Sequence, residues 1–221
     1  MNANVKRKLE KGEREQQFMV DNAGDFVGGV GATAAAEQAV VIAEIHTLSG
    51  EQVSGESTSA QMVANQDDLL DQLIAFLKLM NLAANAFKDV VPGSDTKFRM
   101  PRNRAHHALL ATARAFHDDA IPLTANFIAY GLPATFVADL QTLIDDIEAA
   151  SDTADSGTAS RAAATGGLKD AAKRLMDISR KLNSIVRIKY ADNAKQLAAW
   201  TVASHLEKAP KSKKTKTETP T

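Results

Sequence analysis

The sequence predicts an all-α protein, an antiparallel bundle of long helices with coiled-coil-like packing. Three observations carry this prediction. Hydrophobic residues make up 44% of the 221 residues, which is enough for a buried core. Aromatic residues are only 5% and alanine is abundant, a balance that favours helices over strands. Apolar residues also recur at alternating spacings of four and three over long stretches, as on one face of a packed helix.

Composition excludes several classes of function. The formal net charge is −1, from 26 basic and 27 acidic residues, so no overall field attracts nucleic acid or anionic lipid. The absence of cysteine excludes disulfides, thiolate metal sites and cysteine nucleophiles. The charged first 17 residues lack the apolar core of a signal peptide, and no run approaches the roughly 20 apolar residues of a membrane span. We therefore expect a cytoplasmic protein without a cofactor.

Residues 1–22 are predicted to form a short charged helix that docks weakly on the rest of the chain. Its sizeable apolar anchors are Val5, Leu9, Phe18 and Met19. A glycine-rich stretch follows, in which Gly28–Gly31 resembles a phosphate-binding loop only superficially, because no strand precedes it and the motif is incomplete. We expect a hinge there. Residues 27–207 are predicted to form a single helical-bundle domain, built from the segments 27–91, 102–130 and 134–207.

The segment 27–91 contains the clearest apolar stripe, from Leu69 to Val91, and this stripe stops at Pro92–Gly93. Traced backwards, the same phase continues through the Ser/Gly-rich residues 49–59. Two interpretations are open: a hairpin with a polar turn, or one helix of roughly 60 residues. Each internal glycine costs a helix about 1 kcal/mol, but no proline interrupts the segment, and we favour the continuous helix.

The next two segments are also striped. In 102–130 the stripe begins after Pro101 and ends at Gly131; Pro122 is expected to kink the helix near residues 118–122 without ending it. In 134–207 the stripe keeps its phase through the small-residue stretch 151–167, and the sequence does not choose between a turn there and one helix to residue 200. The lysine-rich residues 208–221 cannot bury a core and are predicted to be disordered.

Three histidines of one predicted helix, His106, His107 and His117, suggest a metal site. Their spacing argues against it, because ligands on one helix face lie three or four residues apart and adjacent residues point in different directions. No Glu-x-x-His pair of a di-iron bundle occurs either. We expect no metal site, and we expect His106, which falls on the apolar stripe, to be packed or hydrogen-bonded.

Three acidic pairs, Asp67–Asp68, Asp118–Asp119 and Asp145–Asp146, are candidates for acid/base or magnesium chemistry. Adjacent helical residues diverge by about 100°, so one pair cannot hold an ion unless another helix contributes ligands. Each pair also lies beside an apolar stripe. We therefore expect these carboxylates to lie on solvated helix faces, and no catalytic residue is nominated.

Basic residues concentrate near the ends of the chain, and those of the C-terminal tail could bind nucleic-acid phosphates. The residues concerned are Lys208, Lys211, Lys213, Lys214 and Lys216. No aromatic residue interleaves them, so a solubilising terminus is the favoured interpretation.

Four segments, covering about residues 95–208, resemble a set of uncharacterised bacterial helical proteins to which no function is assigned. These segments are Phe98–Arg104, Ala115–Asp119, Gly131–Phe136 and Ala199–Glu207. The resemblance implies a bacterial helical protein, and it supplies no activity, cofactor or catalytic residue.

The excess of apolar stripe on the long segments favours a non-enzymatic structural or protein-interaction bundle that associates with itself as a homo-oligomer, or with another helical protein. The alternative is an accessory nucleic-acid-binding protein that uses its lysine-rich termini.

Overall fold

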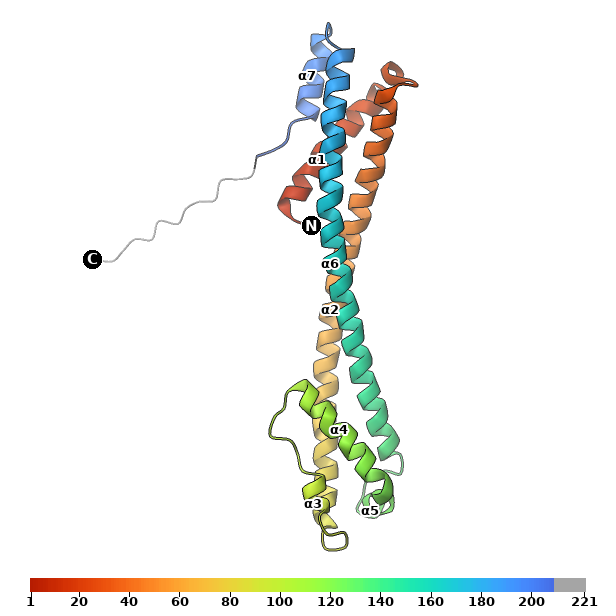
Figure 1. Ribbon diagram of the computed structural model, residues 1–221, viewed down its shortest axis with the longest axis vertical. Coiled ribbons are helices and arrows are strands. Elements are labelled where there is room, and N and C mark those ends of the chain that lie inside the picture. Colours follow the sequence, from red (N-terminus) through yellow and green to blue (C-terminus); the bar gives the residue numbers. More distant parts are fainter. Residues whose placement is uncertain (209–221) are drawn as a thin grey trace, which may run out of the picture. The chain divides into compact units, whose positions relative to one another are not determined.

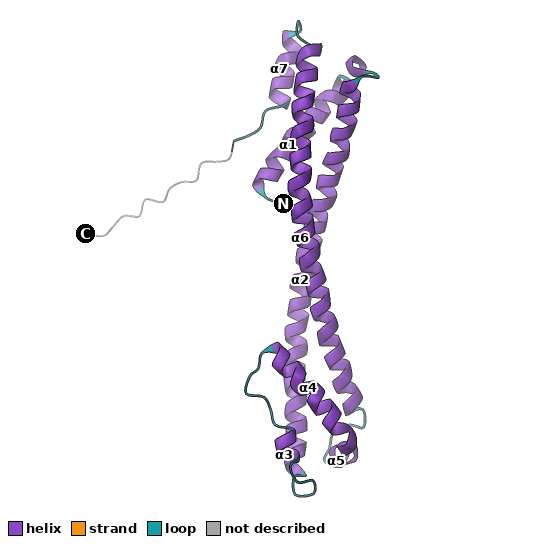
Figure 2. Cartoon of the chain, in the orientation of Figure 1, coloured by secondary structure: helices purple, strands orange, loops and turns teal. Residues whose placement is uncertain are grey.

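The computed structural model describes residues 1–208, and this part of the chain is helical with no strand, which confirms the predicted all-α class (Figures 1 and 2). Its helices, in chain order, are α1 (Ala3–Asp21), η1 (Ala23–Phe26), α2 (Val30–Ala86), α3 (Ser94–Lys97), α4 (His106–Ala120), η2 (Ile121–Leu123), α5 (Thr124–Ala129), α6 (Phe136–Lys189) and α7 (Ala194–Ala203). The elements η1 and η2 are short 3₁₀ helices. No described helix is both long and apolar enough to cross a membrane.

The chain divides into two compact units, and α2 and α6 contribute to both. Unit 1 consists of Met1–Val53 together with the chain from Ser160 onward, and unit 2 is Ser54–Ala159. In each unit α2 and α6 pack antiparallel, which confirms the predicted pairing of long helices. The described part of the tail predicted over 208–221 is Lys208 alone, and the rest lies outside the described residues.

Both small-residue stretches are continuous helix. Residues 49–59 lie inside α2, which confirms the continuous helix favoured there, and residues 151–167 lie inside α6, where the sequence left a turn and a helix open. The reason is close packing in unit 2: a Cβ atom added to Gly157 would lie 2.9 Å from the Gly55 carbonyl oxygen and 3.0 Å from the Ser59 nitrogen. A hydrogen bond of 3.0 Å also joins the Ser59 and Thr158 hydroxyls. The small residues thus let the two helices approach closely.

The continuous helix does not reach residue 200. It ends at Lys189, and the chain turns through residues 190–193 before α7 begins. The Asn193 backbone N–H donates to the Tyr190 carbonyl at 2.9 Å, and the Asn193 side chain caps α7 by accepting from the Gln196 N–H at 3.2 Å. Asparagine is among the residues preferred at a helix N-cap, so this reversal has a local cause.

The sequence predicts a kink near residues 118–122 without an end to the helix, and the structure interrupts the α-helix at this point before helix resumes. α4 gives way to the 3₁₀ turn η2 at Ile121, and α5 follows directly. Pro122 lacks the backbone N–H that would donate to the Asp118 carbonyl. Just beyond it, the Thr124 hydroxyl donates to the carbonyl groups of Ala120 at 3.2 Å and Ile121 at 2.8 Å. The predicted segment 102–130 is helical only from His106 onward.

The core of unit 2 lies between α2, α4, α5 and α6 and contains a cluster of aromatic rings. Phe127 is central to it, with its ring centroid 5.0 Å from Phe87, 4.9 Å from Phe98 and 5.2 Å from Phe136. The loop that carries Phe98 is held by the Asn81 side chain, which donates to the Phe98 carbonyl at 2.7 Å.

The core of unit 1 is built where α1 lies across α2 and α6 and where α7 folds back beside them (Figure 1). The four predicted anchors of α1 are all buried, with exposures of 3–7%. The α1 helix also buries Lys11, Gly12 and Glu15, so its docking surface is larger than the four anchors indicate. At the α7 end, the Phe18 ring packs 5.1 Å from Trp200 and 6.3 Å from Tyr190.

Candidate interaction surface

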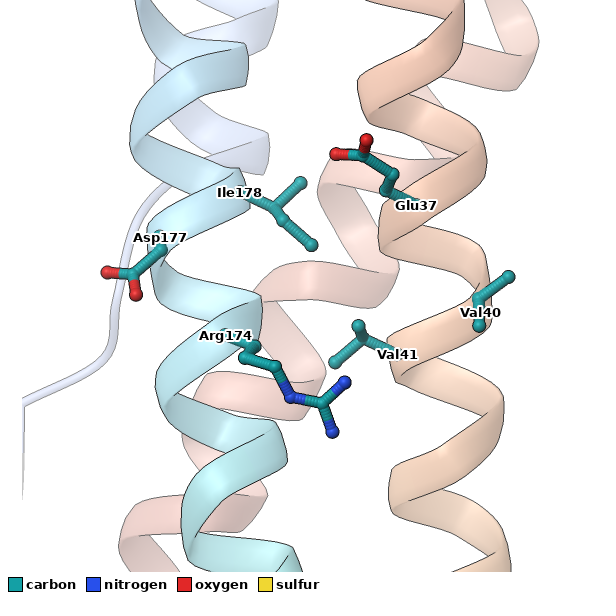
Figure 3. Close-up of a pocket in the computed structure, with 6 residues that line it drawn as sticks. All are labelled: Glu37, Val40, Val41, Arg174, Asp177 and Ile178. Carbon is teal, nitrogen blue, oxygen red and sulfur yellow. The ribbon is translucent and has the colours of Figure 1, made fainter.

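A groove with an apolar floor runs between α2 and α6 in unit 1, and its volume is about 410 Å³ (Figure 3). Val41 of α2 and Ile178 of α6 point toward each other across the groove, and Glu37 and Arg174 point inward above and below them. Asp177 points away from α2, and Val40, which is 68% exposed, lies at the outer edge.

The groove continues along the same helix pair. Val30 precedes Glu37 by seven residues on α2, and Ile185 follows Ile178 by seven on α6, a spacing that returns to the same helix face. These two residues help to line a second hollow, of about 330 Å³, which also includes Ile188. Val30 is 64% exposed and Ile188 is 78% exposed. A strip of apolar side chains therefore lines both hollows, which neither α1 nor α7 helps to line.

We call this strip the open seam. It consists of Val30, Glu37, Val41 and Glu44 of α2 and of Arg174, Ile178, Lys181, Ile185 and Ile188 of α6. The α1 helix packs on another side of the pair, behind it in Figure 3, where it contacts Gln38 and Ser179. Neither α1 nor α7 contributes a residue to the lining of the two hollows.

Charges of opposite sign border the seam. The acidic side is α2, where Glu37 lies 3.5 Å from Lys181, and Glu44 contacts Arg174. The basic side is α6, and its one acidic lining residue, Asp177, pairs with Arg180 on the same helix. The paired side chains are 36–52% exposed, so each pair contributes at most about 1 kcal/mol to stability. These pairs matter more for recognition than for stability, because their acidic side chains all lie on one helix and their basic side chains on the other.

A second polar cluster is buried behind the seam, where α1 meets α2 and α6. The Lys11 Nζ donates to the Glu15 Oε1 at 2.5 Å and also contacts the Ser179 Oγ. The Ser179 hydroxyl donates to the same Glu15 oxygen at 2.8 Å, and the Gln38 amide donates to Glu15 Oε2 at 2.9 Å. The Lys11 and Glu15 side chains are 8% and 0% exposed.

The chemistry of this cluster fits a structural role. A lysine beside a serine can act as the base for a nucleophile, but here the ammonium is paired with a carboxylate and the serine hydroxyl donates its hydrogen bond to that carboxylate. Ser179 is only 3% exposed, so no substrate reaches its oxygen. The cluster instead satisfies the Glu15 carboxylate with three donors from α1, α2 and α6. Among residues 1–208, the Gln38 Oε1 has no hydrogen-bond partner.

Tyr190, at the end of unit 1 where α6 turns toward α7, has an altered acidity. Its pKa is raised from 10.0 to about 12, first by burial and then by the hydrogen bond to Asp25 Oδ2, of 2.5 Å, and by that carboxylate's charge. Since the folded pKa lies above the unfolded one, the contribution to stability is complete below pH 10 and is lost as the pH rises toward about 12.

We expect Asp25→Ala to move the pKa of Tyr190 back toward 10 without reaching it, because burial of the ring remains. The measurement is the ultraviolet absorbance of the phenolate during a pH titration. Both proteins should also carry Tyr130→Phe. The chain has two tyrosines, so this change leaves Tyr190 as the tyrosine that titrates. Identical titration curves with and without Asp25 would contradict the assignment.

The three candidate histidines do not come together. His106 is partly buried, and the Gln66 Nε2 lies 3.3 and 3.4 Å from its two ring nitrogens, which confirms the prediction of a packed or hydrogen-bonded side chain. His107 is exposed, and the Nδ1 of His117 lies 3.0 Å from the neighbouring Asp118 carboxylate. Within residues 1–208, no group of three or more histidine and acidic side chains is placed to hold a metal ion.

The acidic pairs lie on the wet sides of their helices, as predicted. Five of the six carboxylate residues are exposed, namely Asp67, Asp68, Asp118, Asp145 and Asp146. The sixth, Asp119, is partly exposed and forms an ion pair of 2.6 Å with Lys97.

The lysines proposed for nucleic-acid binding fall mostly beyond the described chain. Lys208 is exposed, and Lys211, Lys213, Lys214 and Lys216 lie outside the described residues. Nucleic-acid binding by these lysines stays a prediction.

The seam and the buried cluster were both missed by the sequence pattern. The four-three spacing of the segment 134–207 puts Leu175, Ile178, Leu182 and Ile185 on a single stripe. The structure buries the two leucines and leaves the two isoleucines partly exposed. A signal was present in the charges. Glutamates at 37 and 44, and basic residues at 174 and 181, repeat with the seven-residue period of the stripe and border its exposed part.

Comparison of the chain with protein-family models, with curated proteins and with solved structures finds no match. Functional inference therefore rests on the residues and geometry described above.

Proposed function

We propose that this chain is a non-enzymatic structural or protein-interaction protein that associates with itself through an apolar helix face. The observation that carries the proposal is the open seam. It exposes Val30 and Ile188 and leaves Ile178 and Ile185 partly exposed, while Val41, at 5% exposure, forms its buried floor. Apolar strips bordered by charge are typical of helix–helix interfaces. The bacterial origin and cytoplasmic setting belong to the proposal as predictions from the sequence.

The polar chemistry of unit 1 supports a non-enzymatic role. The cluster around Glu15 resembles a reactive site in its residue types, but its donors from Lys11, Gln38 and Ser179 are engaged by the buried Glu15 carboxylate. Its position joins three helices beneath the seam, and a rigid support of this kind suits a binding surface.

A second apolar face lies on α2 in unit 2 and competes with the seam as an interface. Leu79 and Leu82 are 59% and 67% exposed, and Ala75 and Ala86 extend the four-three spacing on both sides. The charged side chain within this stretch is Lys78, with no acidic residue from Ala75 to Ala86. This face thus offers apolar area without a paired arrangement of charges, and we favour the seam.

We expect purified protein to have a mass above that of one chain, 23.6 kDa, at tens of micromolar, and to return toward that mass on dilution. Burial of the exposed apolar side chains supplies the driving force. Size-exclusion chromatography with multi-angle light scattering measures the mass directly. A strictly monomeric species across the concentration series would remove the proposal.

A further inference from the structure

The two sides of the open seam carry opposite charges, and each acidic side chain on α2 lies at the same height along the helices as a basic side chain on α6. The intrachain pairs show the levels: Glu37 of α2 lies beside Lys181 of α6, and Glu44 lies beside Arg174. Between the two pairs, Val41 and Ile178 form the apolar floor. The seam therefore has two levels of charge, each with an acid on α2 in contact with a base on α6, and an apolar floor between the two levels.

A second copy of the chain can meet this surface in two symmetric ways, since a two-fold interface uses the same patch twice. With the two-fold axis parallel to the helices, α2 of one copy faces α6 of the other. With the axis perpendicular to the helices in the plane of the interface, α2 faces α2 and α6 faces α6. The apolar floors meet in both arrangements, and the charges distinguish them.

The parallel axis places opposite charges together at every level. Glu37 then faces Lys181 of the second copy and Glu44 faces Arg174 of the second copy, while the valines and isoleucines of the two seams form a shared centre. The perpendicular axis brings the glutamates of both copies together and the basic residues of both copies together. Like-charge juxtaposition of this kind costs several kcal/mol in an interface.

We infer that the occupant of the open seam is a second copy of this chain, paired about a two-fold axis that runs along α2 and α6, so that four helices enclose the apolar floor. The inference rests on the proposed self-association and names its surface and geometry. A self-complementary order of charges around an apolar centre is what a two-fold interface requires, and this seam has that order.

Two sets of charge reversals test the inference. In the half-reversed protein, Glu37→Lys and Glu44→Lys make both sides of the seam basic. In the fully reversed protein, Arg174→Glu and Lys181→Glu are added, so α2 is basic and α6 is acidic. Full reversal keeps an opposite charge beside each side chain within the chain, and helical content and melting temperature by circular dichroism verify that both proteins fold.

We expect half reversal to weaken self-association by about a hundredfold or more, because all facing charges become alike. Full reversal should restore it to near the wild-type level, since acid again faces base. A mixture of tagged wild-type and untagged fully reversed protein should form no mixed species, because in that pairing like charges face each other. Light scattering gives the masses, and affinity capture of the tagged chain reports mixing.

A matched control addresses the other apolar face. Leu79→Lys with Leu82→Lys alters the exposed leucines of unit 2 and should leave the mass unchanged. If this variant abolishes association and half reversal does not, the interface lies in unit 2 and the inference is wrong. A mixed species of wild-type and fully reversed chains would establish the perpendicular axis and likewise overturn it.

The remaining outcomes separate the inference from the proposed function. An oligomer that ignores half reversal leaves self-association standing and removes the parallel axis, because on the perpendicular axis like charges already face each other. Absence of a mixed species with the fully reversed chain would then remove the seam as the surface as well. Loss on half reversal without rescue by full reversal excludes the parallel axis. A wild-type chain that is monomeric at all concentrations removes both.

Discussion

Replacement of Glu15 by alanine is expected to lower the free energy of unfolding by about 3–5 kcal/mol, the range for breaking a buried ion pair from one side. Glu15 is fully buried and accepts hydrogen bonds from three side chains. Without it, the Lys11 ammonium remains inside the protein at 8% side-chain exposure with no counter-charge, and the Gln38 amide loses its acceptor. Urea denaturation followed by circular dichroism measures the change.

Two further variants separate lost charge pairing from lost packing. The double variant Lys11→Met with Glu15→Leu removes both charges and fills the space with apolar atoms, so we expect it to be much closer to wild type than Glu15→Ala. Glu10→Ala is the matched surface control on the same helix, because Glu10 is partly exposed and its ion pair with Lys6 spans 3.8 Å. Equal stability of Glu15→Ala and Glu10→Ala would show that the buried cluster does not hold α1.

Replacing a glycine of α6 by alanine is expected to change the free energy of unfolding in opposite directions at two positions, Gly157 and Gly166. At Gly157 the new Cβ would meet backbone atoms of Gly55 and Ser59 at 2.9 and 3.0 Å, and backbone cannot move aside as a flexible side chain can. We expect Gly157→Ala to lower the free energy of unfolding by about 1–3 kcal/mol, the usual cost of overpacking. The two helices must separate to relieve the contact.

Gly166 provides the matched control. It lies in the same helix, and nothing lies within 4 Å of the position of its added Cβ. Gly166→Ala should therefore raise stability by about 0.5–1 kcal/mol, the helix-propensity gain of alanine over glycine. Thermal melts of both variants, compared with wild type, give the two signs. A stabilising effect at both glycines would show that α2 and α6 do not approach closely at Gly157.

The helices could be predicted from the spacing of apolar residues for a physical reason. A helix buries one stripe, so the four-three rhythm around Leu77 and Phe87, or Leu168 and Leu175, reports helix and inward face together. Proline chemistry is equally local, and the break at Pro122 occurs where its missing donor requires. Such features need no knowledge of distant residues.

The continuity of α2 and α6 through the small-residue stretches was harder to predict from the sequence. Helix propensity alone makes Gly157 unfavourable for a helix. In the structure, however, its missing side chain lets α2 and α6 approach closely. The sign of that glycine's effect depends on which residue faces it. That residue is about a hundred positions away in the chain, and a single sequence does not pair them.

The buried cluster and the seam show the same limit. Lys11 and Glu15 are four apart on a charged helix, a spacing typical of a solvent-exposed ion pair, and only Gln38 and Ser179 from other helices reveal that the pair is buried. Ile178 and Leu175 look equivalent on a stripe, and the placement of α1 decides that the leucine is covered and the isoleucine is left at the seam.

By itself, then, the sequence determined the helical class, the apolar faces and the proline break, because periodicity and proline act through neighbours within a few residues. The tertiary structure alone decided that the stretch 151–167 stays helical, that Lys11 and Glu15 are interior, and that neither α1 nor α7 covers one side of the α2–α6 pair in unit 1. Those outcomes depend on which helices meet, and burial is a property of the meeting surfaces.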